Sequence, residues 1–292
     1  MSVYSQQASN VRKTWFLMIF FVSIISGLFY LMATVFKQPN LVFVGLAISL
    51  GQSFIGYFWG GSIAISMAGG QEITQETNPN IYNMVENLSR TGGIPIPRIY
   101  ISPDPSANAF ACGRDPKHAN ICLNQGLINL LDKNQLEGVI AHELSHIKNR
   151  DTLIMTMVSI LSGIITFVVD FGFRSMMWGS GDDNDNRSPL VFVFYIVLSI
   201  LAPLASSLIA MSVSREREFL ADATAVTMTR YPEGLITALE KLYISPTPSD
   251  HYSTSTNHFY IAPPKQSFGE NIQGWFSTHP KIEERVEALR KM

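Results

Sequence analysis

Four long apolar runs alternate with stretches of mixed polar and apolar residues along this 292-residue chain. The first two runs, residues 15–36 and 41–61, lie close together near the N-terminus, and the other two cover residues 153–173 and 190–213. Each run has about 20 residues or more, which as an α-helix is long enough to cross the roughly 30 Å hydrocarbon core of a bilayer. The pattern therefore predicts four transmembrane helices arranged as two hairpins.

These runs divide the chain into four parts. Residues 1–66 are expected to form a polar N-terminal tail and the first hairpin, and residues 153–213 the second hairpin. Residues 67–152 and 214–292 have the composition of a soluble protein. Because two spans separate these soluble parts, both lie on the same side of the membrane, where they can build one domain around a shared core. The expected fold class is a mainly α membrane protein with one soluble α+β domain.

The first soluble part contains both helical and strand patterns. Residues 78–90 have helical periodicity, and Gly92-Gly93 follow as a helix stop. Three short apolar runs separated by turns, residues 98–101, 108–113 and 120–124, indicate a small antiparallel sheet. An edge strand of that sheet could bind an extended polypeptide by strand addition, although a purely structural sheet is an equally good interpretation.

The strongest chemical signal is the sequence His142-Glu143-Leu144-Ser145-His146, which has the pattern HExxH. On a helix, residues four apart share a face, so His142 and His146 can bind one metal ion together. Glu143 would then lie beside the open coordination position and could take a proton from a water there. The alternative is an amphipathic helix that carries two hydrogen-bonded histidines.

The residues before this motif favour a helix. Asp132 and Gln135 have the spacing of a capping box at a helix N-terminus. The residues expected to form a buried apolar stripe are Leu136, Val139, Ile140 and Leu144. Both signals place the HExxH motif near the C-terminal end of one amphipathic helix.

A catalytic zinc site with two histidines needs a third protein ligand, which is commonly a Glu on a later helix. Residues 214–229 are predicted to be helical and place Glu218 and Asp222 four positions apart on one face. This spacing suits one metal ligand and one carboxylate that holds a ligand histidine by its other ring nitrogen. The alternative is that Glu218 is one more charge on a Glu/Arg face with Arg215, Glu216 and Arg217.

Composition agrees with a membrane protein and excludes one class of partner. Charged residues make up only 15 % of the chain, against about 25 % in ordinary soluble domains. The net charge of −2 leaves no basic excess with which to bind nucleic acid. Cys112 and Cys122 are the only cysteines, and since their spacing fits no common zinc motif, they are expected to be reduced thiols.

The positions of the basic residues predict the orientation in the membrane. Of the 21 Lys and Arg residues, only Lys37, Arg174 and Arg187 lie in the connections within the two hairpins. Since basic residues concentrate on the cytoplasmic side, both termini and the metal site are expected in the cytoplasm. That compartment also agrees with free cysteines.

Two sections make up the C-terminal part beyond the predicted helix at residues 214–229. Residues 245–274 are rich in Ser, Thr, Pro and Asn and are expected to form a long surface loop. Residues 281–290 follow His279-Pro280 and have the pattern of an amphipathic helix.

These features together resemble the HtpX family of integral-membrane zinc metalloproteases, which are relatives of the CAAX prenyl-protein endopeptidases. The resemblance covers most of the chain, including the order of the four spans. The matching motifs are Asn108-Ala109-Phe110-Ala111, His142-Glu143-x-x-His146, Glu218-Phe219-x-Ala221-Asp222 and His279-Pro280.

The resemblance implies a zincin-like soluble domain and a role for each residue of the metal motifs. His142, His146 and Glu218 would bind one zinc ion per chain, and Glu143 would be the general base. Asp222 would hold a ligand histidine without touching the metal.

Two further roles are implied by the same resemblance. Asn108, followed by Ala109 and Phe110, would lie on the substrate-binding edge strand, and His279 would stabilise the tetrahedral intermediate. From the residues alone, Asn108 could instead cap a turn, and His279 could simply precede a helix that begins after Pro280.

The implied function is that of a zinc endopeptidase of the bacterial inner membrane that degrades misfolded membrane proteins in stress response and protein quality control. Its partners would be polypeptide substrates and the lipid bilayer, and its work would overlap with that of other quality-control proteases in the same membrane. Two alternatives stay open at this stage. One is a narrow processing protease that cuts a defined peptide or a prenylated tail, and the other is a non-catalytic membrane scaffold whose zinc is structural.

Overall fold

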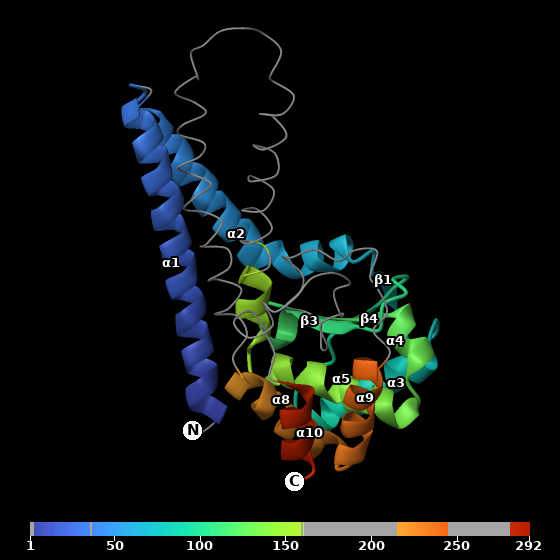
Figure 1. Ribbon diagram of the computed structural model, residues 1–292. Coiled ribbons are helices and arrows are strands. Elements are labelled where there is room, and N and C mark those ends of the chain that lie inside the picture. Colours follow the sequence, from blue (N-terminus) through green and yellow to red (C-terminus); the bar gives the residue numbers. More distant parts are fainter. Residues whose placement is uncertain (1–2, 36, 159, 161–214, 245–280) are drawn as a thin grey trace, which may run out of the picture.

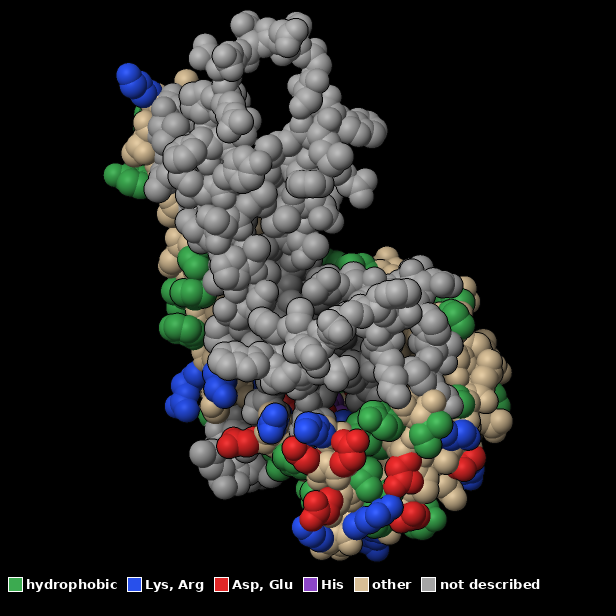
Figure 2. Space-filling model, viewed as in Figure 1, with side chains coloured by type: hydrophobic (Ala, Val, Ile, Leu, Met, Phe, Trp, Pro, Cys, Tyr) green, Lys and Arg blue, Asp and Glu red, His purple; other side chains and the backbone are tan. Residues whose placement is uncertain are grey.

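The computed structural model describes residues 3–35, 37–158, 160, 215–244 and 281–292 (Figure 1). Two long helices form a hairpin that extends from a globular part, and the globular part holds a sheet and the other described helices. This part of the chain is mainly helical, as predicted. Figure 2 shows acidic and basic side chains gathered on the globular part, at the end of the molecule opposite the tip of the hairpin.

The hairpin consists of α1 (Val3–Val35) and α2 (Leu41–Met67), which pack against each other. Both are long and apolar enough to cross a membrane, over Ala8–Gly27 in α1 and over the whole of α2. The residues expected to form a polar tail are helical from Val3 onward, because α1 continues past its apolar section. Two of its polar side chains, Asn10 and Thr14, are buried.

The second predicted hairpin, residues 153–213, lies almost entirely outside the described residues, so it stays a prediction. The short section that is described, residues 152–158, is helical and buried. It packs closely on α2, because a Cβ built on Gly60 would come within 2.8 Å of Thr156 Cγ2. A small residue at this position therefore lets the two helices approach each other.

The sheet contains four described strands in the order β1-β2-β4-β3. Their bounds are Gln71–Ile73 for β1, Arg98–Ser102 for β2, Ala109–Gly113 for β3 and Ala119–Asn124 for β4. The prediction of an antiparallel sheet was wrong in one respect: β2 and β4 are parallel, so the sheet is mixed. The reason is that β3 does not pair with β2. The chain skips one strand position, and β4 returns between β2 and β3, antiparallel to β3.

Both faces of the sheet are covered, which explains why β3 is buried at every position. Ala109 and Ala111 face a core that β3 shares with α5 (Lys133–Lys148). Phe110 and Cys112 belong to a second core, formed with residues of α1, α2 and the helical section at 152–158. The sheet thus joins the soluble core to the membrane hairpin.

Five more α-helices belong to the described globular part. They are α3 (Pro79–Gly92), α4 (Gln125–Leu130), α8 (Arg215–Thr229), α9 (Pro232–Ile244) and α10 (Ile282–Leu289). Of these, α3, α8 and α9 pack on α5. The predicted stop of α3 is confirmed, since Gly93 has a left-handed φ of 68°. Helices α4 and α9 were not predicted. α5 contacts β3 and β4 as well as α8 and α9, so it lies at the centre of the globular part (Figure 1).

Candidate metal centre

The N-terminus of α5 has the local structure that the sequence predicted. The Asp132 side chain accepts a hydrogen bond from the backbone N–H of Gln135, and the Gln135 side chain accepts one from the backbone N–H of Asp132. The predicted apolar stripe is buried. Burial then continues without a break from Gly138 to Ile147, so that the HExxH motif lies enclosed in the core.

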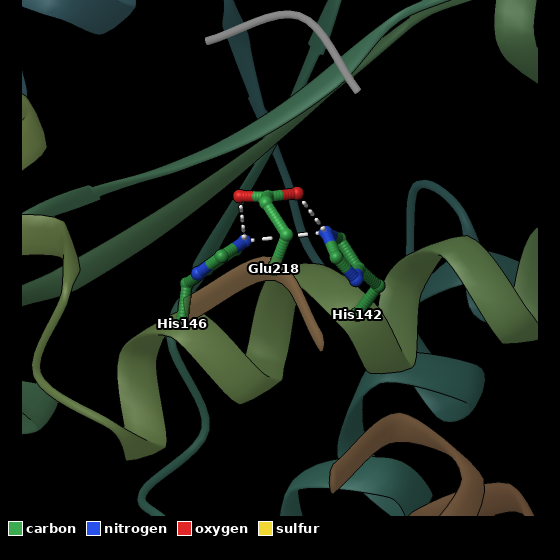
Figure 3. Close-up of side chains that lie close together, drawn as sticks. All are labelled: His142, His146 and Glu218. Atoms are coloured by element: carbon green, nitrogen blue, oxygen red, sulfur yellow. Dashed lines mark hydrogen bonds and ion pairs between the residues drawn. The ribbon is translucent and has the colours of Figure 1, made fainter. Parts of the chain in front are cut away.

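His142 and His146 from α5 and Glu218 from α8 point toward one another (Figure 3). The two Nε2 atoms lie 3.2 Å apart, and the Glu218 carboxylate oxygens lie 3.6 Å from His142 Nε2 and 3.8 Å from His146 Nε2. All three residues are buried. Two helices with 66 residues between them in the sequence, α5 ending at Lys148 and α8 beginning at Arg215, thus supply one cluster of three side chains that could bind a metal ion.

Each histidine has a buried carboxylate on its other ring nitrogen. Asp222, one turn after Glu218 on α8, lies 2.9 Å from His142 Nδ1. Asp151, just beyond the end of α5, lies 3.2 Å from His146 Nδ1. A carboxylate at Nδ1 favours the tautomer with a proton on that atom, which leaves the Nε2 lone pair of each histidine directed into the cluster.

Arg285 of α10 is fully buried and binds the acidic side chains of this site. Its guanidinium donates to both Asp222 oxygens, at 2.6 and 2.8 Å, and its Nη1 lies 3.5 Å from Glu218 Oε2. Such a bidentate pair fixes the orientation of the carboxylate. α10, close to the C-terminus, is in this way tied to the metal-ligand helices.

The ionisable groups of the site have shifted pKa values. Burial by itself would lower the pKa of His142, but its hydrogen bonds to Asp222 and Glu218 outweigh that effect and raise the pKa to about 9. Burial tends to raise the pKa of Asp222, yet the charge of Arg285 holds it below the usual range. The Asp222 carboxylate is therefore ionised at neutral pH and can accept a hydrogen bond from the histidine.

Glu143 is buried beside the cluster and is held in place by β3. The backbone N–H of Ala111 hydrogen-bonds to its carboxylate. Burial raises the pKa of Glu143 above the usual range, and positive charge on His142 and His146 acts in the opposite direction. A carboxylate whose pKa lies above its ordinary value, beside a cluster that could bind a cation, is suited to take and return a proton.

Of the residues predicted to act on the substrate, the structure describes Asn108, Ala109 and Phe110 but not His279. Asn108 is buried immediately before β3, and its backbone C=O accepts from Asn124 N–H of β4 at 2.9 Å. Ala109 and Phe110 begin β3, which among the described strands lies at the edge of the sheet next to α5. His279 lies outside the described residues.

Asp151 and Arg285 were missed by the sequence reasoning. Arg285 had a detectable signal, because it lies on the apolar face of its helix with Ile282, Val286 and Leu289. A charged residue on such a face is buried only with a partner. Asp151 had a weaker signal: it is the acidic residue that follows the HExxH helix most closely.

Comparisons with family models, with curated sequences and with solved structures agree with one another. The model of peptidase family M48 matches residues 75–292. The chain is 41 % identical to a Protease HtpX homolog of Tropheryma whipplei (strain Twist), over 99 % of this chain and 98 % of that protein. It is 38 % identical to a Protease HtpX homolog of Caldanaerobacter subterraneus subsp. tengcongensis, over 100 % and 98 %. The crystal structure of S. mikatae Ste24p has a similar fold, with a TM-score of 0.51 and 18 % identity over 98 % of this chain and 67 % of that one.

Proposed function

The chain belongs to peptidase family M48 and is an HtpX-type metallopeptidase, and from this premise we propose that it is a zinc endopeptidase whose site is His142, His146, Glu218 and Glu143. The observation that supports this most strongly is the convergence of two histidines and a glutamate from α5 and α8, with Glu143 adjacent. Two N-terminal helices that are long and apolar enough to cross a membrane support a membrane location.

The cluster fits a zinc ion. Two nitrogens that each lie 2.0–2.1 Å from a tetrahedral zinc are about 3.3 Å apart. The Nε2 atoms of His142 and His146 are 3.2 Å apart and both lie beside the Glu218 carboxylate, a spacing that suits two nitrogens bound to one cation. His142, His146 and Glu218 would hold the ion, with Asp222 and Asp151 orienting the histidines. When bound, zinc lowers the pKa of a water and polarises a carbonyl group.

Glu143 is proposed to move the proton. Its carboxylate takes a proton from the water as the water oxygen attacks the carbonyl carbon of the scissile peptide. It then gives that proton to the amine nitrogen as the C–N bond breaks, so that the carboxylate is regenerated. The backbone N–H of Ala111, which hydrogen-bonds to this carboxylate, would help to position it for both transfers.

The substrate is proposed to bind as an extended strand along β3. Support comes from the position of β3 at the edge of the described sheet and from its direct link to Glu143 through Ala111. A strand added at this edge would bring its peptide groups alongside the base. We assign Asn108, Ala109 and Phe110 to this binding strand. His279 is assigned to stabilisation of the oxyanion, on the basis of the family resemblance alone.

The proposed setting is the bacterial inner membrane, with the site in the cytoplasm and misfolded membrane proteins as substrates. Support for the orientation comes from the basic residues, which are concentrated in the soluble segments. Support for the substrate class comes from the second core, in which β3 and residues 153–158 pack against the apolar hairpin. Because β3 borders the site, cleavage would take place close to the bilayer surface.

The test is cleavage of casein, an unfolded protein, by the purified full chain and by its Glu143→Ala variant, with zinc content measured for both. Wild type should hold one zinc and cut, and Glu143→Ala should hold zinc and lose activity by at least about a hundredfold, since the general base is absent. Glu137→Gln, a half-buried glutamate on the same helix, is the matched control and should retain activity.

Two outcomes would contradict the proposal. Full activity of Glu143→Ala would exclude Glu143 as the base. A zinc-loaded wild type that cuts no unfolded protein would favour a narrow processing protease if it cleaves a defined membrane peptide or prenylated peptide, and a scaffold if it cleaves neither.

A further inference from the structure

Asn10 is an unusual residue for its place in the chain. It lies on α1 within the apolar section that is able to cross a membrane, and its side chain is only 4 % exposed. A buried amide is costly unless its hydrogen bonds are satisfied. Thr14, one turn later, satisfies its hydroxyl locally by donating to the backbone C=O of Asn10 at 2.9 Å.

The Asn10 amide instead reaches a segment about 140 positions away in the sequence. Its Nδ2 donates to the backbone C=O of Asn149 at 3.2 Å and also to Asp151 Oδ1. Figure 1 shows the N-terminal end of α1 at the level of the globular part, on the side of α8. These two bonds join the first helix of the chain to the residues that directly follow the HExxH helix.

Asp151 divides its two carboxylate oxygens between two partners. Oδ1 accepts from Asn10, and Oδ2 lies 3.2 Å from His146 Nδ1. The backbone around Asp151 is also constrained, because Arg150 has a left-handed φ of 57° and Asp151 N–H donates to His146 C=O at 2.9 Å. A carboxylate held at both oxygens cannot rotate away from the histidine without breaking the bond to α1.

Each histidine of the site is therefore held by a carboxylate, and each carboxylate is fixed by a further side chain. His142 is held by Asp222, which Arg285 fixes from α10. His146 is held by Asp151, which Asn10 fixes from α1. The side chains that fix the two carboxylates come from different parts of the chain. Arg285 lies on α10 of the globular part, whereas Asn10 lies on α1 of the hairpin.

We propose that Asn10 is a positioning residue of the metal centre, which fixes the orientation of His146 through Asp151. The metal affinity then depends on how α1 packs against the globular part. This inference rests on the proposed function, since it takes His146 as a metal ligand. A shift of α1 away from the globular part removes the donor on Asp151, frees the carboxylate to rotate and loosens His146.

The test measures the zinc dissociation constant of the detergent-solubilised full chain by competition with a chromophoric chelator. Loss of a group that orients a metal ligand typically weakens metal binding by about 10–100-fold, and Asn10→Ala is expected to fall in this range. Thr14→Val is the matched control, because Thr14 is also buried on the same helix but its hydroxyl donates to the backbone C=O of Asn10 within that helix; its zinc affinity should stay within about twofold of wild type.

The double variant separates a positioning role from a general structural one. If Asn10 acts through Asp151, Asn10→Ala should add almost no further loss of zinc affinity in an Asp151→Ala background. Additive losses would overturn the proposal, and so would an Asn10→Ala affinity within about twofold of wild type.

An exchange variant keeps the test decisive if Asn10→Ala does not fold. Asn10→Asp combined with Asp151→Asn swaps donor and acceptor between the two positions and retains an oxygen for His146. Asn10→Asp alone sets two carboxylates against each other and should lose zinc affinity, whereas the exchange should recover most of it; a folded exchange variant without recovery would contradict the inference. Failure of wild type itself to bind zinc would instead refute the proposed function.

Discussion

Arg285 offers a direct measure of how much the buried charges of the site depend on one another. In the Arg285→Leu variant the hydrophobic volume of the side chain is roughly kept, but its guanidinium is lost. Asp222 then loses two hydrogen bonds of 2.6 and 2.8 Å, and Glu218 loses a cation at 3.5 Å. Both carboxylates remain buried, and the charge of Asp222 in particular is left next to His142 without a guanidinium.

The expected loss follows from the burial. Removing one partner of a buried ion pair costs about 3–5 kcal/mol, because the remaining charge stays desolvated. For a domain of about 150–250 residues, 1 kcal/mol corresponds to about 2–4 °C in Tm, so Arg285→Leu should lower the Tm of the metal-free protein by about 6–20 °C.

Arg290→Leu is the matched control on the same helix. Arg290 pairs with Glu240 at 2.9 Å, a shorter distance than that between Arg285 and Glu218, but its side chain is 63 % exposed and that of Glu240 is 43 % exposed. A solvent-exposed pair of this kind contributes about 0–1 kcal/mol, so its loss should lower Tm by less than about 4 °C.

The assay is thermal unfolding of the detergent-solubilised chain at pH 7 with a metal chelator present, followed by far-UV circular dichroism. The metal-free form is the informative one, since a bound cation would compensate part of the charge that Arg285 leaves behind. Equal and small Tm changes in Arg285→Leu and Arg290→Leu would refute the reasoning, because they would mean that the buried carboxylates need no guanidinium.

Two more predictions concern regions away from the metal ligands. Gly60→Ala should lower the Tm, with a cost of about 1–3 kcal/mol from overpacking against Thr156, where the new Cβ would lie 2.8 Å from Cγ2. An alanine Cβ at position 51 of the same helix would meet no described residue within 4 Å, so Gly51→Ala should instead stabilise α2 slightly; a lower Tm in both variants would contradict the packing argument. Burial raises the pKa of Cys122 to about 12 and that of Cys112 still further, so both thiols stay protonated at pH 8. Neither should react with Ellman's reagent in the native protein and both should react in denaturant, and fast labelling of the native protein would show that this part of the sheet is open.

Much of the candidate site was predictable because its signals are local. The HExxH spacing, the capping box at Asp132 and the apolar stripe all operate within one helix, and their geometry follows from the helical repeat. Glu218 and Asp222 could be added because they lie one turn apart and because an even number of predicted spans returns the chain to the same side. The structure brings His142, His146 and Glu218 together, in agreement with that reasoning. Their roles in catalysis remain part of the proposal.

The groups that hold these ligands were decided by tertiary structure. The mixed sheet is one example: strand runs reveal where strands begin and end, but the insertion of β4 between β2 and β3 depends on pairing between distant segments. Asn10, Asp151 and Arg285 are another. Each is a polar residue whose role depends on a partner from a different element, and the sequence of its own element does not identify that partner.

The physical reason for this division is the range of the interactions. Helix periodicity, capping and the i, i+4 spacing of the two histidines are set by bonds along a few residues, so the sequence by itself determined the HExxH helix, the shared face of its histidines and the two apolar helices of the hairpin. Burial of a charge or an amide is set by what the folded chain packs around it, so only the tertiary structure showed that Arg285 compensates Asp222 and that Asn10 links the membrane hairpin to His146 through Asp151.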